Sequence, residues 1–435
     1  ILNLPEGANK ADFISTVKMG TTVGTNALLE REGEAVALLV TKGFKDVLRI
    51  AYQNRPDIFA LNIQLPELLY QTVLEIDERV SAQGEALVAI KQEEVRQALE
   101  KIYASGIRSV AIVLLHAWQY QQHELQLQGI AKAIGFTQIS VSHQASPLMK
   151  MVSRGDTTVV DAYLSPLLKR YVNQVAEGLQ NTADSDCRLL FMQSHGGLIA
   201  ANRFAGKDSI LSGPAGGIVG AVNTAKQAGF DKIISFDMGG TSTDVAHYAG
   251  ELERSFETDV AGVRMRAPMM SIHTVAAGGG SLLFFDGMRY RVGPESAGAN
   301  PGPAAYRRGG ALTVTDANVM LGKLPLFPRV FGPHGDLPLD TDRVQTLFSE
   351  LSQTINQAAH QQQTPEQVAE GFLKVAIENM ANAIKRISVQ KGYNVAEYTL
   401  CCYGAAGGQH ACQVADRLAM QRILIHPFAG VLSAY

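Results

Sequence analysis

Continuous apolar runs alternate with amphipathic runs over the first 150 residues of the chain. The apolar runs predict four strands, and they occupy residues 35–41, 73–80, 109–115 and 138–143. Between the second and third of these runs, Val95, Leu99 and Ile102 share one helical face, and Gly106 is a candidate C-cap. This alternation predicts an α/β layer.

A long amphipathic helix is predicted after this layer. Its apolar positions recur at spacings of three and four, at Val160, Leu164, Leu167, Tyr171 and Val175. The pattern predicts a helix over residues 157–180, which is our candidate for a hinge.

Strands interleaved with glycine clusters begin near residue 188. Two further helices are predicted at 344–361 and 365–391, the second with Thr364 as N-cap and Pro365 in its first turn. Asp316 and Asn318 are expected to cap a helix that begins near Val319. The change in pattern predicts two domains, at residues 1–185 and 186–435.

The segment KIISFDMGGTSTDV, residues 232–245, is an apolar strand that runs into polar and glycine residues. Such an order suits a β-hairpin around a polyphosphate, because backbone N–H groups without a neighbouring Cβ and hydroxyl groups both donate to phosphate oxygens. Asp237 and Asp244 would hold Mg²⁺, which prefers few carboxylates together with phosphate oxygens. The competing interpretation is an ordinary tight hairpin. The candidate phosphate contacts are Gly239, Gly240, Thr241, Ser242 and Asp244.

Three other glycine clusters resemble ligand loops. LSGPAGGIVGAVNTA opens a helix, whose bare N-terminal amides suit an anion, although capping and close packing explain the glycines equally well. The other two clusters follow predicted strands, and each is either a ligand contact or a plain loop. The candidates are Gly213, Gly216, Gly278, Gly279, Gly280, Gly404, Gly407 and Gly408.

Taken together, DMGGTSTDV, LSGPAGG, TVAAGGGS, GPESAGANPGP and YGAAGGQHA resemble the hydantoinase A/5-oxoprolinase family. VKMGTTVGTNALLEREGE and VTKGFKDVLRIAYQNRPDIF are similar to the same family, and LPELLYQTVLEIDERV favours its 5-oxoprolinases. The resemblance implies an α/β fold of the actin-like, sugar-kinase-like ATPase class, with duplicated ribonuclease H-like lobes. It assigns residues 237–244 to the second phosphate loop and residues 404–408 to the adenosine loop.

The resemblance further implies an ATP- and Mg²⁺-dependent hydrolase of a cyclic amide, above all 5-oxo-L-proline, which ATP and water convert to glutamate, ADP and phosphate. An N-methylhydantoinase, or an acetone-carboxylase-type subunit, would keep the catalytic plan and change the substrate. A non-catalytic ATP switch of the actin or chaperone type is the alternative from another class. A hydantoinase B-like subunit or domain is an expected partner, and the protein is expected to be oligomeric.

The catalytic base and the substrate contacts have less specific signals. Asp237 is the first candidate for the base that activates water, and His410 is the second. Thr21, Thr22 and Asn26 form a polar cluster that either binds substrate or caps a helix. Arg154 either binds a substrate carboxylate or lies in a solvated helical turn.

Family members begin with a first phosphate hairpin of the same design, and no such sequence precedes Lys18. We therefore expect a fragment with part of the ATP site, inactive with ATP and 5-oxoproline until an N-terminal hairpin is restored.

The composition excludes several other classes of protein. The chain has 435 residues, with 38 Lys and Arg against 41 Asp and Glu, so no basic surplus favours nucleic acid. The longest apolar runs, of six residues each, are too short to cross a membrane. Only four cysteines occur, which favours reduced thiols in the cytoplasm, and no His or Cys spacing matches a zinc site.

Overall fold

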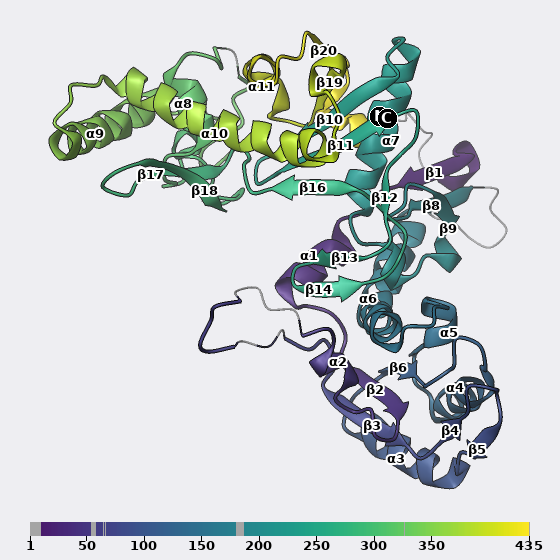
Figure 1. Cartoon of the computed structure of the whole chain (residues 1–435). Coiled ribbons are helices and arrows are strands. Elements are labelled where there is room, and N and C mark those ends of the chain that lie inside the picture. Colours follow the sequence, from purple (N-terminus) through teal and green to yellow (C-terminus); the bar gives the residue numbers. More distant parts are fainter. Residues whose placement is uncertain are drawn as a thin grey trace. The chain divides into compact units, whose positions relative to one another are not determined.

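The computed structural model describes residues 10–53, 58–63, 65, 67–179, 187–325 and 327–434. Residues 1–9 lie outside the described residues. So do residues 54–57, which belong to the family-like segment VTKGFKDVLRIAYQNRPDIF. The chain divides into two compact units, one of residues 1–215 with 254–270, the other of residues 216–253 with 271–435 (Figure 1). The predicted domain boundary after residue 185 stays a prediction.

The first unit contains a four-stranded parallel sheet in the order β3-β2-β6-β7. Its strands are β2 (Val36–Thr41), β3 (Thr72–Ile76), β6 (Ser109–Val113) and β7 (Gln138–Val141). The helices α3 (Gln92–Ala104) and α4 (Gln122–Ile134) and one set of strand side chains form one core, and α6 (Met151–Gly178) packs with the other set. The predicted α/β layer is therefore confirmed.

A second sheet of the first unit has the order β1-β8-β9. β1 (Thr16–Met19) is parallel to β8 (Arg188–Met192), which is antiparallel to β9 (Leu198–Ala200). Three short antiparallel pairs complete the strands of this unit. They are β4 (Arg79–Val80) with β5 (Ala86–Val88), β12 (Arg254–Ser255) with β15 (Met269–Met270), and β13 (Thr258–Val260) with β14 (Val263–Met265). The short helices are α1 (Val23–Glu30), α2 (Val47–Ile50) and α5 (Ser142–Ala145).

The second unit is built on a five-stranded sheet in the order β16-β11-β10-β19-β20. β11 (Thr243–Ala249) is antiparallel to β10 (Lys232–Met238) and to β16 (Ile272–Val275). β19 (Thr399–Tyr403) is parallel to β10 and to β20 (Arg422–Ile425). β11 thus runs against the other four strands, in agreement with the predicted ribonuclease H-like lobe.

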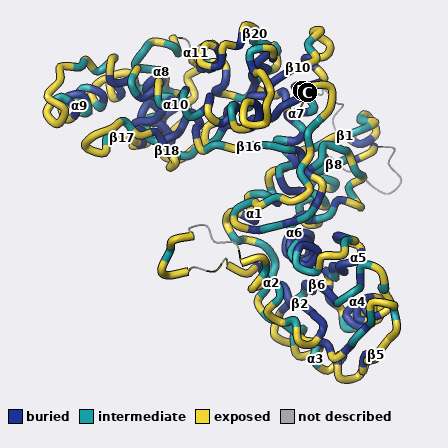
Figure 2. The backbone as a smooth tube through the Cα atoms, in the orientation of Figure 1, coloured by how far each residue is buried: buried dark blue, intermediate teal, exposed yellow. Residues whose placement is uncertain are grey.

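Helices cover this sheet and extend beyond it. α7 (Ser212–Gln227) leads into the unit, and α10 (Pro365–Ile387) lies at the centre of its core, where Phe372 and Met380 have no exposed surface. The remaining elements are the hairpin β17 (Ser281–Phe285) with β18 (Tyr290–Ser296), and the helices α8 (Val314–Met320), α9 (Thr341–Ala359) and α11 (Ala411–Arg417). Figure 2 shows the buried backbone concentrated in the sheet and along α10.

Several predicted elements differ at their ends, and polar side chains explain the differences. The run 73–80 is broken by Glu78, whose buried carboxylate accepts hydrogen bonds from Thr41 and binds His123. The strand from 138 ends at Val141, because Ser142 and His143 turn into α5 and bind Glu124.

α6 and α8 both begin earlier than the sequence predicts. α6 starts at Met151, since the hydroxyl groups of Thr157 and Thr158 donate to carbonyl groups one turn back and are thereby satisfied inside the helix. The expected caps of a helix from Val319 are wrong: Thr313 is the N-cap of α8, and Asp316 closes a capping box with it.

Candidate active site

The carboxyl ends of β10 and β19 and the start of β11 form the candidate site of the second unit. Asp237 of β10 lies opposite Asp244 of β11 and opposite Tyr403 of β19. Asp244 in turn lies opposite Thr274 of β16. Residues opposite one another in a sheet point to the same face, so these four side chains form one row across four strands. We call Thr274, Asp244, Asp237 and Tyr403 the cross-strand row.

Burial raises the pKa of both carboxylates in the row, and like charge adds to the effect at Asp237. Burial, with a smaller contribution from the neighbouring Asp244 charge, raises the pKa of Asp237 to about 6. Burial also raises the pKa of Asp244, although the hydroxyl of Thr274 donates to its Oδ1 at 2.5 Å and opposes that effect. Two adjacent acids that resist ionisation favour a cation between them.

Tyr403 closes the row on its buried side. Its hydroxyl lies 2.8 Å from the hydroxyl of Ser235, and burial raises its pKa well above the ordinary value. A Cβ on Gly217 of α7 would lie 3.0 Å from the Tyr403 ring and 3.5 Å from Asp237 Oδ2. The small residue therefore lets the helix pack directly behind the row.

The hairpin tip between β10 and β11 exposes backbone amides. Gly239 N donates to Ser242 O at 3.0 Å, which leaves Gly240 and Thr241 as the two exposed residues of the tip. Within the described residues, neither the Gly240 N–H nor the Thr241 N–H donates a hydrogen bond. A tip of unpaired donors suits an anion. The φ of Gly240 lies outside the left-handed region, so its glycine is not needed for a positive φ.

The loop of Gly278, Gly279 and Gly280 supports this tip from behind. Gly279 N donates to Gly239 O at 3.1 Å, and Gly280 N donates to Gly240 O at 2.6 Å. A Cβ on Gly278 would lie 2.6 Å from Gly240 O, which no side chain can occupy without moving the tip. All three glycines are buried, and their role as cofactor contacts stays a prediction.

The loop after β19 also meets the end of β10. Ala406 N donates to Met238 O at 3.0 Å. Gly404 has a φ of +82°, and a Cβ there would lie 2.3 Å from Asp237 Oδ1. Glycine is required at this position on both grounds. Gly407 is buried against Cys402, whereas Gly408 is exposed, and the adenosine role of this loop stays a prediction.

His410 lies at the far end of that loop with no exposed surface. Its Nε2 accepts a hydrogen bond from Asn318 Nδ2 at 3.2 Å, and its Nδ1 has no partner among the described residues. Burial, followed by the charge of Lys323, lowers the pKa of His410 to about 4. A neutral, enclosed imidazole of low basicity is poorly placed to activate water.

The predicted substrate residues belong to the first unit. Thr21 is buried, and its amide donates to Ser212 Oγ at 3.0 Å. Thr22 and Asn26 are exposed at the start of α1, and Gly213 adjoins Thr22. Arg154 has no exposed surface and donates to Leu114 O at 2.7 Å. The substrate role of all four residues stays a prediction, and only Thr22 and Asn26 are exposed.

Three residues of the candidate site were not predicted from the sequence, namely Ser235, Thr274 and Tyr403. Tyr403 ends a strand directly before a glycine loop, as Asp237 does, and that parallel could have identified it. Thr274 has no comparable signal, because its role depends on the register of β16 against β11.

A two-carboxylate site at a glycine hairpin, on a sheet in which only the second strand is reversed, defines an actin-like ATPase fold. The chain belongs to the hydantoinase/oxoprolinase family, whose model matches residues 154–435, while the N-terminal region model matches residues 3–135. The family prediction is confirmed.

Within this family the chain is similar to named 5-oxoprolinases. It is 44% identical to a 5-oxoprolinase of Dictyostelium discoideum and 45% identical to one of Saccharomyces cerevisiae, in both cases over 97% of this chain. The chain spans only 37% and 35% of those two relatives, respectively.

Solved structures support the fold assignment. The ATP-dependent caprolactamase of Pseudomonas jessenii matches 98% of this chain and 62% of its own, with a TM-score of 0.81 at 29% identity. A nucleotide-free acetone carboxylase structure matches 98% of this chain and 61% of its own, with a TM-score of 0.78 at 22% identity. The predicted fold class is therefore confirmed. Within the described residues, no helix is long and apolar enough to cross a membrane.

Proposed function

We propose that the chain carries the ATP site of an ATP-dependent cyclic amide hydrolase whose substrate is 5-oxo-L-proline. The observation that carries the proposal is the cross-strand row beside a hairpin tip with unpaired amides. The names of the relatives support the substrate class, since 5-oxoprolinases and a caprolactamase all act on lactams.

The chemistry explains why such an enzyme uses ATP. An unstrained lactam is stabilised by resonance, so water attacks it slowly. In the proposed reaction the lactam oxygen takes the γ-phosphoryl group and ADP leaves. Water then adds to the ring carbon, the C–N bond breaks, and a second water releases phosphate from the resulting acyl phosphate to give glutamate.

The residues of the site fit this reaction. Asp237 and Asp244 would hold Mg²⁺, because two adjacent carboxylates together with phosphate oxygens are a donor set that this cation prefers. When bound, Mg²⁺ supplies positive charge beside the transferring phosphoryl group. The amides of Gly240 and Thr241 would donate to phosphate oxygens, and no group of three or more acidic, His or Cys side chains among the described residues offers a fuller metal site.

Asp237 is the proposed base for water, in preference to His410. Its pKa of about 6 leaves it ionised at pH 7, yet a better proton acceptor than an ordinary aspartate. His410 is enclosed and a weaker base.

We further propose a hydantoinase B-like partner subunit or domain, an oligomeric assembly and a cytoplasmic location. The designation of one relative as caprolactamase subunit alpha, which is 30% identical over 99% of this chain, supports the first. The buried thiols Cys401 and Cys402 support a reducing compartment.

The test is Asp237→Asn in the full-length protein, assayed for ADP release with and without 5-oxo-L-proline. We expect turnover to fall by at least about 100-fold, because transition-state contacts are lost. Asp231→Asn, an exposed acid immediately before β10, is the matched control and should keep wild-type turnover. Near-normal ADP release from folded Asp237→Asn would falsify the assignment. ADP release that responds to a protein partner and not to the lactam would favour the ATP switch.

A further inference from the structure

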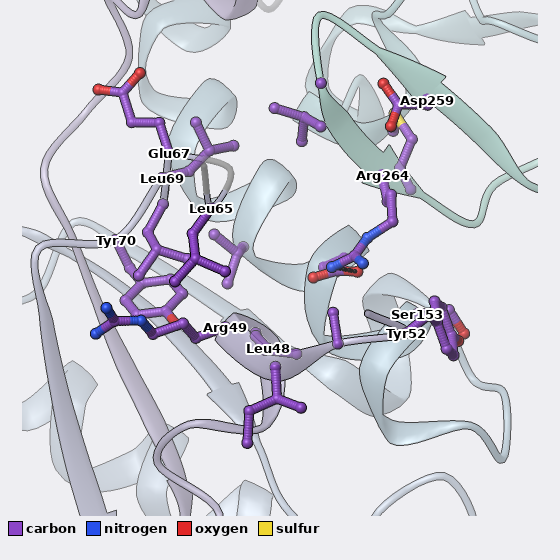
Figure 3. A pocket seen from close by; sticks show the side chains of 18 of the residues that line it. Leu48, Arg49, Tyr52, Leu65, Glu67, Leu69, Tyr70, Ser153, Asp259 and Arg264 are labelled. Atoms are coloured by element: carbon purple, nitrogen blue, oxygen red, sulfur yellow. Dashed lines mark ion pairs between the residues drawn. The ribbon is translucent and has the colours of Figure 1, made fainter. Parts of the chain in front are cut away.

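The two acids of the cross-strand row have no positively charged neighbour. Within the described part of the chain, neither Asp237 nor Asp244 interacts with a Lys, Arg or His side chain. The cavity of about 830 Å³ in the first unit offers a contrast (Figure 3), because Asp156 in its wall already forms an ion pair with Arg264, with Oδ2 and Nη2 3.2 Å apart. A partly buried pair of acids that lacks such a partner gains most from a bound cation.

The two acids of the row differ in their hydrogen bonds. Asp237 accepts none from the described residues. Asp244 accepts one, which the Thr274 hydroxyl donates to Oδ1 at 2.5 Å, and no described residue donates to its Oδ2. A carboxylate turns easily about its last side-chain bond unless a neighbour holds it. Thr274 therefore determines which oxygen of Asp244 stays open.

The strand that carries Thr274 is fixed against the strand that carries Asp244. β16 is the edge strand of the sheet, and it pairs with β11 through four residue pairs that include Thr274 with Asp244. Beyond the end of β16, the hydroxyl of Thr243 in β11 donates to Ala277 O at 2.5 Å. The Thr274 side chain is exposed, so packing of its methyl group contributes little. Its main contact is the hydrogen bond to Asp244.

Divalent cations differ in how they use a carboxylate. Ca²⁺ accepts variable geometry and is often bound by both oxygens of one carboxylate. Mg²⁺ demands near-octahedral geometry, and one or two carboxylates hold it together with waters and phosphate oxygens. An oxygen that already accepts a short hydrogen bond has less capacity for a metal. The contact from Thr274 thus leaves Oδ2 as the better ligand oxygen of Asp244.

We propose that Thr274 is a positioning residue, which holds Asp244 as a one-oxygen ligand and so favours Mg²⁺ over Ca²⁺ in the nucleotide site, an inference that rests on the proposed function. Thr274 acts through Asp244 and touches no reacting atom. Loss of such a hydrogen-bond partner of a metal ligand typically lowers metal affinity by about 10- to 100-fold. A plain cross-strand pair, in contrast, would stabilise the sheet and leave the cation preference unchanged.

Nucleotide binding in different cations tests this role without turnover. The probe is the ATP analogue AMP-PNP, titrated by calorimetry into the full-length protein in Mg²⁺, in Ca²⁺ and in EDTA. We expect the wild type to bind more tightly in Mg²⁺ than in Ca²⁺. Thr274→Val keeps the shape of the side chain without its hydroxyl, and should reduce the ratio of the Ca²⁺ to the Mg²⁺ dissociation constant at least about tenfold. Thr274→Ser keeps the hydroxyl and should keep the ratio, and affinity in EDTA should be equal in all three proteins.

Thr354→Val is the matched control, because it removes an exposed hydroxyl of α9 that donates to Glu350 O. It should keep the wild-type ratio. An unchanged ratio in Thr274→Val, or a wild type without cation preference, would overturn the inference. So would an equal loss of affinity in all three solutions, which would mean that the hydroxyl contacts the nucleotide or supports the sheet. If Thr274→Val melts early, Thr274→Ala takes its place in the same titrations.

Turnover in the full-length protein separates this inference from the proposed function. In Mg²⁺, Thr274→Val should lower lactam-dependent ADP release at least about tenfold, and Thr274→Ser should restore it. If the wild type responds to the lactam and Thr274→Val keeps the wild-type cation ratio, the positioning role is wrong and the function stands. If no lactam stimulates the wild type, the function fails, and the cation ratio of AMP-PNP binding still decides the role of Thr274.

Discussion

The fold opposes the ionisation of Asp237 in the candidate site. Its pKa rises from 3.8 to about 6 on folding, so the folded state holds the proton more tightly than the unfolded chain does. The free energy of unfolding should therefore fall as pH rises from about 4 to about 6, by an amount on the order of 2 kcal/mol for this group.

Denaturant titrations in EDTA at pH 4, 5, 6 and 7 would measure this fall. The plot of unfolding free energy against pH should be flatter for Asp237→Asn than for the wild type. The comparison isolates Asp237 from Asp156 of α6, whose pKa burial also raises to about 6. Parallel curves for the two proteins would contradict the shift.

Gly240 and Gly278 should respond differently to the same added methyl group. A Cβ on Gly240 meets nothing within 4 Å, whereas a Cβ on Gly278 meets Gly240 O at 2.6 Å. Gly240→Ala should leave the free energy of unfolding within about 0.5 kcal/mol and weaken binding of an ATP analogue. Gly278→Ala should cost on the order of 1–3 kcal/mol.

Thermal melts and calorimetric titration of the analogue measure both effects. Unchanged nucleotide affinity in Gly240→Ala would remove the tip from the phosphate site. A stable Gly278→Ala would show that the loop behind the tip can move aside.

At the scale of elements, the N-terminus of α10 offers a clean test. Thr364 accepts from Gln367 N, and the Gln367 side chain accepts from Thr364 N, so two helix-end donors are satisfied. Thr364→Ala should lower the free energy of unfolding by about 1 kcal/mol. The control is Thr346→Ala on α9, whose hydroxyl donates only to Asp342 O and whose loss should cost less than about 0.5 kcal/mol. Equal losses in urea titrations would argue against the capping box.

Elements with regular apolar spacing could be predicted from the sequence, and those stabilised by buried polar contacts could not. β2, β6, α3 and α10 follow their patterns closely. The first turn and a half of α6, residues 151–156, escaped prediction, because this stretch includes Arg154, which is polar and yet fully buried. Asp237 and Asp244 were identified from their glycine context, whereas Thr274 depends on strand register, which no local pattern encodes.

At the scale of the whole molecule, each compact unit has a core of its own. Phe372 belongs to the core of the second unit and Phe191 to a core of the first, and both are fully buried. Phe372→Ala should cost about 3–5 kcal/mol and speed amide exchange in β10 and β19. Phe191→Ala should speed exchange in β8 instead.

Hydrogen-exchange mass spectrometry of the two variants measures the amide exchange rates of β10, β19 and β8. The peptides of β2 and β6 serve as the reference for Phe372→Ala. Faster exchange throughout the chain in Phe372→Ala would mean that the units unfold as one.

The cross-strand row also makes the site a reporter of correct folding. A slip of β11 by one residue against β10 would turn Asp244 to the opposite face and bring Val245 or Thr243 beside Asp237. A chain in that register would still hold a sheet, yet it would lose one of its two carboxylates. A nucleotide that binds only the correct pairing would stabilise it by mass action over the slipped form. Refolding with ATP present would thus select, from among similar sheets, the one with an intact site.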